Sequence, residues 1–137
     1  MKKTNIRKEA LSWFANAYPT NGKIKVYASK FYAPSESWSK TSVWFFQIPE
    51  RIVSQKTMEH IFLLCENNLL GEKFIVVKLP ISFIQKHQQK FETNRKMQKV
   101  MLYLSAEIRD KFKEVRKGSN IDFSRFIINS KLISYSQ

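Results

Sequence analysis

Apolar residues near the N-terminus recur at the spacing of a helix. One stripe runs along residues four, three and four apart, and a second stripe lies beside it. The first stripe is Ile6, Ala10, Trp13 and Ala17, and the second is Leu11, Phe14 and Tyr18. This period predicts a helix over residues 5–17 that is buried over a wide arc. Pro19 and the Asn21-Gly22 pair predict the turn that ends it.

Strand patterns dominate the next part of the chain. Residues 23–32 alternate, with Ile24, Val26 and Ala28 on one face, which predicts a half-exposed strand with a basic outer face. Residues 41–48 are β-branched and aromatic and end at Pro49, so we expect a strand with Trp44 and Phe46 on one face and Phe45 on the other, and we assign all three to the core. Residues 60–65 and 74–79 are nearly continuous apolar runs, which predicts a central hairpin covered on both faces.

Helical patterns return after Pro80, which can occupy the first turn of a helix. Residues 100–104 predict another strand, and Ser105 is placed to cap a helix that carries Phe112 and Val115 until Gly118. A short helix is predicted over residues 121–128. The expected fold class is α+β, with a single layer of mostly antiparallel sheet (about five strands) packed with an N-terminal helix and two or three C-terminal helices. We expect residues 1–137 to form a single domain.

Composition adds a strong positive charge to this picture. The chain of 137 residues is 43% hydrophobic and 14% aromatic, which is typical of a folded protein. Its 24 lysines and arginines against 11 acids give a net charge of +13, which favours a polyanionic partner. Residues 1–40 carry eight cations and two acids and residues 86–117 carry ten and four, net +6 each. We predict that these two stretches converge into one positive surface.

The sequence also indicates the compartment. Cys65 is the single cysteine, so no intramolecular disulfide can form, and two histidines do not suffice for a zinc cluster. Neither a signal peptide nor an apolar run of about 18 residues is present. We therefore expect a cytoplasmic protein that does not engage a membrane.

Aromatic residues lie among the lysines of the first basic stretch, a pattern typical of binding to single-stranded nucleic acid. The leading hypothesis is therefore a protein that binds DNA or RNA, with lysine and arginine at the phosphates and Tyr32 or Trp38 available for stacking. The predicted contact residues are Lys23, Lys25, Lys30, Tyr32, Trp38, Lys40, Arg95, Lys96 and Lys99. An alternative is a basic protein-interaction subunit with an acidic protein partner.

A small metal-dependent nuclease is the enzymatic alternative. The outline is loosely similar to the restriction-endonuclease-like fold, but Val76-Val77-Lys78 has valine where that motif places an acid. The remaining candidates for catalysis are Glu36, Glu9 and His87, although the sequence favours a surface or structural role for each of them. Only this alternative would require a cofactor, Mg²⁺; the binding hypothesis requires none.

Overall fold

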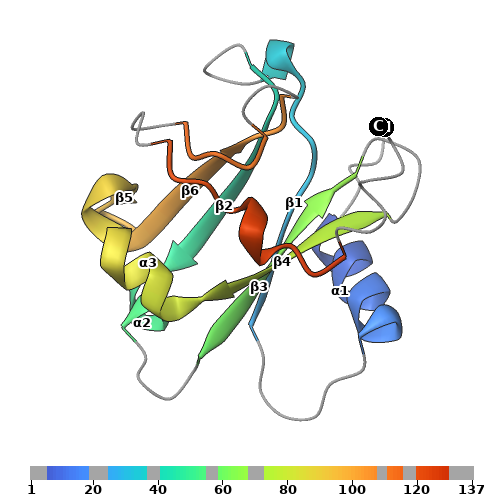
Figure 1. Cartoon of the computed structure of the whole chain (residues 1–137), viewed down its shortest axis with the longest axis horizontal. Coiled ribbons are helices and arrows are strands. Elements are labelled where there is room, and N and C mark those ends of the chain that lie inside the picture. Colours follow the sequence, from blue (N-terminus) through green and yellow to red (C-terminus); the bar gives the residue numbers. More distant parts are fainter. Residues whose placement is uncertain are drawn as a thin grey trace.

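The computed structural model describes residues 6–18, 25–36, 41–54, 59–67, 73–107, 111–115 and 120–129 (Figure 1). The described helices are α1 (Ile6–Ala17), α2 (Glu50–Val53) and α3 (Ile81–His87), with 3-10 turns η1 (Pro34–Glu36), η2 (Gln88–Lys90) and η3 (Ser124–Phe126). The described strands are β1 (Val26–Ser29), β2 (Val43–Pro49), β3 (His60–Glu66), β4 (Phe74–Pro80), β5 (Glu92–Asn94) and β6 (Lys99–Ser105). The α+β class and the N-terminal helix predicted from the sequence are confirmed.

The described strands form two three-stranded sheets, so the prediction of a single layer was wrong. The first sheet has the order β1-β3-β4 and the second the order β2-β6-β5. β1 runs parallel to β3, whereas the other pairs are antiparallel. β3 and β4 pair as the predicted hairpin and are apolar on both faces, so both faces of their sheet must be covered. The need to cover both faces accounts for the layered arrangement, in which the first sheet lies between other elements.

Helix α1 covers one face of the first sheet. Ala10 and Phe14 are buried there against Phe74 and other residues of β1, β3 and β4. The ring of Phe14 lies 5.0 Å from that of Phe62, and the ring of Trp13 lies 5.4 Å from that of Phe74. The wide apolar arc predicted for this helix therefore packs on the sheet.

The other face of the first sheet packs against the second sheet and forms the main core. Alternate residues of β2 and β6 point into this core from the second sheet: Trp44, Phe46, Ile48, Val100, Leu102 and Leu104. Phe45 lies on the opposite face, where its ring stacks on that of Tyr103 at 4.5 Å. The predicted alternation along β2 is confirmed.

The helix predicted after the 74–79 strand is confirmed as α3, which begins at Ile81; Pro80 is its N-cap residue, with an extended backbone, rather than part of its first turn. The inner side of this helix is buried and consists of Ile81, Phe83 and Ile84. The side-chain amide of Gln85 donates to the carbonyl oxygen of Val53 at 2.6 Å and ties α3 to α2.

The prediction of a helix after Ser105 is wrong for the described residues 111–115. These residues form a turn and two isolated bridges, which pair Glu114 with Leu104 and Lys113 with Asp122. Phe112 has a φ of 69°, which a right-handed helix does not allow, and its ring stacks on Trp44 at 5.0 Å. Burial of this ring in the core therefore overrides the local helical pattern. Only η3 of the short helix predicted over 121–128 is formed.

Candidate nucleic-acid interface

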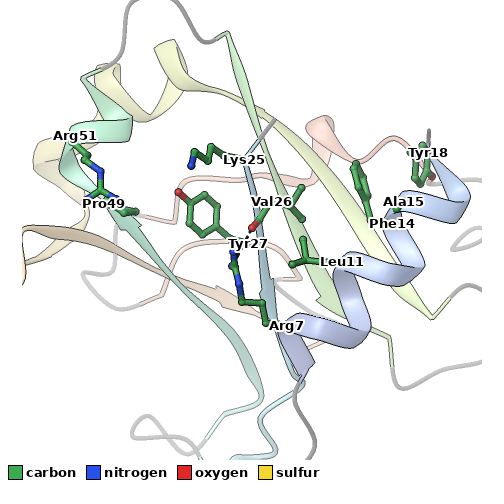
Figure 2. Close-up of a pocket in the computed structure, with 10 residues that line it drawn as sticks. All are labelled: Arg7, Leu11, Phe14, Ala15, Tyr18, Lys25, Val26, Tyr27, Pro49 and Arg51. Carbon is green, nitrogen blue, oxygen red and sulfur yellow. Dashed lines mark hydrogen bonds between the residues drawn. The ribbon is translucent and has the colours of Figure 1, made fainter. Parts of the chain in front are cut away.

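β1 and β2 are the edge strands of their respective sheets, and they diverge from a common point. Near that point, Tyr32 and Val43 exchange two backbone hydrogen bonds of 3.0 Å. The amide of Phe45 donates to the hydroxyl oxygen of Ser29 at 2.8 Å. From there β2 separates from β1 toward Pro49, as Figure 2 shows. The two edges thus form the sides of a V-shaped groove.

An open cleft of about 630 Å³ occupies the wide end of this groove. Its floor and walls come from α1, β1 and the junction of β2 with α2 (Figure 2). The lining residues are Arg7, Leu11, Phe14, Ala15, Tyr18, Lys25, Val26, Tyr27, Pro49 and Arg51. A smaller cleft of about 280 Å³ shares Arg7 and Tyr27 with it and continues to Tyr32 and Phe45. We call the two clefts together the β1–β2 groove.

Three cationic side chains from three separate segments line the wide end of the groove. Arg7 belongs to α1, Lys25 directly precedes β1, and Arg51 belongs to α2. All three residues are exposed. None of the described residues that line this cleft is acidic, so these charges are not neutralised by the lining itself. The wide end of the groove is therefore suited to an anion.

Arg7 is held in position by the strand that it covers. Its guanidinium Nη1 donates to the carbonyl oxygen of Val26 at 3.4 Å. An edge strand offers such unpaired backbone groups, and a planar guanidinium retains further donors for a second partner. Arg7 can thus bind β1 and a ligand oxygen at the same time.

Tyr27 lies between the cations, with Arg7 and Arg51 on either side in Figure 2. Partial burial raises the pKa of its phenol above the ordinary value of 10.0, and the positive charges of Arg51 and Arg7 oppose that effect. The phenol therefore remains protonated at neutral pH and can donate a hydrogen bond. Its half-buried ring offers an aromatic face within the groove.

The structure brings some of the predicted contact residues together and separates others. Lys25 and Tyr32 line the groove, and the ammonium of Lys30 lies 4.9 Å from the centre of the Tyr32 ring. Arg95 and Lys96 lie in the turn between β5 and β6, and Lys99 begins β6. Figure 1 shows β5 and β6 on the side of the molecule away from α1. Neither Arg95 nor Lys96 nor Lys99 lines the described part of the groove, but Lys99 pairs with Pro49, which does, and Arg95 lines a separate cleft together with Glu50. Lys23, Trp38 and Lys40 lie outside the described residues.

Sequence reasoning missed Arg7 and Arg51 as members of the site. Arg51 follows a strand-ending proline in the part of the chain where positive and negative charges balance, so charge counting gave no signal for it. Arg7 lies one turn before Leu11 and two turns before Phe14, so it continues an apolar stripe of the helix, and the charge count did not single it out. Tyr27 carried a signal, because it falls on the basic face of its strand beside Lys25.

The candidates for catalysis do not meet in one place. Glu9 forms an ion pair with Lys73. His87 ends α3, and the side chain of Glu36 lies outside the description. Figure 1 shows α1 and α3 on opposite sides of the molecule. Within the described ranges, no group of three or more His, Cys, Asp or Glu side chains could hold a metal ion.

Comparison of the chain with protein families, curated proteins and solved structures finds no match. The described helices include none of the length and apolar character needed to cross a membrane.

Proposed function

We propose that this protein binds single-stranded nucleic acid in the β1–β2 groove. The observation that carries the proposal is the convergence of Arg7, Lys25 and Arg51 on one open cleft whose described lining contains no acid. Guanidinium groups bind phosphate through paired hydrogen bonds, and lysine adds a point charge. These three side chains would contact the phosphates of a bound strand.

The aromatic residues of the groove support a single strand as the ligand. Tyr27 and Tyr32 lie along the groove beside the cations, and bases that are not paired can stack on such rings. Paired bases in a duplex keep their faces covered by their neighbours. A groove that combines cations with aromatic faces therefore favours unpaired nucleotides.

The lining of the groove supports binding rather than cleavage. A metal-dependent nuclease places carboxylates beside the scissile phosphate, where they hold the ion. The described residues of both clefts provide cations, aromatic rings, apolar side chains and Gln47, but no carboxylate. We therefore assign phosphate binding, and no reaction, to this groove.

Fluorescence anisotropy with labelled single strands of about 12 nucleotides tests the proposal, a length within the usual range for such sites. Three phosphate contacts predict that log K falls with log salt at a slope of about −2 for a single strand. The variant Lys25→Ala should weaken binding and reduce the slope by about 0.7.

The matched control is Lys78→Ala. Lys78 is also an exposed lysine, but it belongs to β4, the edge strand on the far side of the first sheet from β1. This variant should keep the affinity and the slope of the wild-type protein. Equal effects of the two variants would show that overall charge, and not the groove, controls binding. Absence of binding at low salt would overturn the proposal.

A further inference from the structure

A second open cleft lies on the other side of α2 from the β1–β2 groove. Its volume is about 700 Å³. It is bounded by α2, the α3–η2 segment and the β5–β6 hairpin, and its lining residues are Glu50, Gln85, Gln88, Gln89, Phe91, Thr93, Arg95 and Gln98. We call it the glutamine cleft.

The chemistry of this cleft differs from that of the groove. Four of its lining residues are glutamines, and each carboxamide offers both donors and an acceptor. Glu50 and Arg95 provide one negative and one positive charge, so the lining has little net charge. Phe91 also lines the cleft, but it is buried in the core and leaves almost none of its ring accessible to a ligand. Such a cleft fits a neutral, flat ligand with a mixed edge of donors and acceptors, which is the chemistry of a nucleobase.

Two hydrogen bonds attach the walls of the glutamine cleft to α2. The side-chain amide of Gln85 donates to the carbonyl oxygen of Val53 at 2.6 Å. The backbone amide of Glu50 donates to the carbonyl oxygen of Gln98 at 2.9 Å. Both walls are therefore held against the same short helix, which fixes the positions of the backbone segments that carry the glutamines.

Consecutive residues of α2 connect the two clefts. Arg51 lines the groove and Glu50 lines the glutamine cleft. A strand whose phosphate is held by Arg51 would therefore cross α2 next to the glutamine cleft. We infer that this cleft receives a base of the bound strand and selects it by hydrogen bonds to its Watson–Crick edge. The inference rests on the proposed function of the groove, to which it adds base selectivity.

Anisotropy with single strands of about 12 adenines, cytosines or thymines provides the test. The wild-type protein should prefer one base over another by about fivefold or more, since pairing with the correct edge contributes about 1–3 kcal/mol. The variant Gln88→Ala should reduce this preference to within about twofold while it still binds all three strands. Gln98→Gly should act in the same way. Gln98 has a φ of 54°, a conformation that glycine adopts freely, so the turn is retained.

Two controls separate the inference from the proposed function. Ser82→Ala changes an exposed residue of α3 outside the lining and should leave the preference intact. Lys25→Ala should weaken binding of all three strands by a common factor. Equal wild-type affinity for the three strands, or an unchanged preference in the glutamine variants, overturns the inference alone. Failure of the wild-type protein to bind any strand overturns the proposed function and the inference with it.

Discussion

The guanidinium of Arg7 donates to the carbonyl oxygen of Val26, so α1 is attached to the open edge of β1 by a residue that also lines the groove. This contact couples the packing of the N-terminal helix to the shape of the site. α1 contributes to the core through Phe14 and to the groove through Arg7, which lies two turns earlier on the same side of the helix.

Arg7→Lys separates charge from geometry at this contact. Lysine keeps the positive charge but lacks the planar group that serves Val26 and a phosphate together. We expect the salt slope of strand binding to remain, while the affinity falls by about fivefold, the equivalent of one hydrogen bond. Anisotropy at several salt concentrations measures both quantities. Equal affinity of the two proteins would show that the guanidinium geometry is not used.

Tyr27 provides a test of stacking. The variant Tyr27→Phe keeps the ring and should retain most of the affinity, whereas Tyr27→Ala should lose about 1–3 kcal/mol of binding free energy. Quenching of tyrosine fluorescence by the added strand gives an independent measurement, because it should diminish in both variants. If Tyr27→Ala binds as well as the wild-type protein, the ring does not contact the strand.

The strand period was sufficient to predict that Trp44 and Phe46 share one face of β2 and that Phe45 lies on the other, but not that Phe45 would be only partly buried. Trp44 and Phe46 lie in the core and Phe45 does not, because side chains of a strand alternate whatever its partner is. The alternation does not specify which strand pairs with β2. The parallel pairing of β1 with β3, which separates the two sheets, could therefore not be predicted from alternation.

The site was only partly predictable for a related reason. Lys25 and Tyr32 could be found because they lie close together in the sequence, among other lysines. Arg51 joins them through the path of the chain after Pro49, which depends on tertiary packing. In the same way, Phe112 lies in a segment with a helical pattern, but its ring is buried on Trp44 with a backbone conformation that no helix contains.

Phe112→Ala should destabilise the folded protein strongly. The ring is 3% exposed and stacks on Trp44, so its removal leaves a cavity in the main core. We expect the free energy of unfolding to fall by about 3–5 kcal/mol, measured by urea denaturation with tryptophan fluorescence. Met97→Ala is the control, because Met97 is 53% exposed and its truncation should change stability by less than about 0.5 kcal/mol. Similar losses in the two variants would contradict the placement of Phe112.

His87 allows a prediction about pH. Its ring lies 4.7 Å from that of Phe83, and partial burial is the largest cause that lowers its pKa below the ordinary 6.5. The positive charges of Lys90, Lys86 and Arg125 lower it further. Between pH 6.5 and the lower folded-state pKa, the unfolded chain binds the proton more readily. The contribution of His87 to stability is therefore present above pH 6.5 and is lost as the pH falls through this window.

NMR titration of the His87 ring protons measures this shift directly. The midpoint should lie below pH 6.5 in the wild-type protein and should rise in the double variant Lys86→Gln/Lys90→Gln, because two of the three cations that oppose protonation are removed. It should remain below 6.5, since partial burial and Arg125 are retained. Lys78→Gln, which removes an exposed charge from β4, should leave the midpoint unchanged. A midpoint at or above 6.5 in the wild-type protein would contradict the position of His87 among these cations.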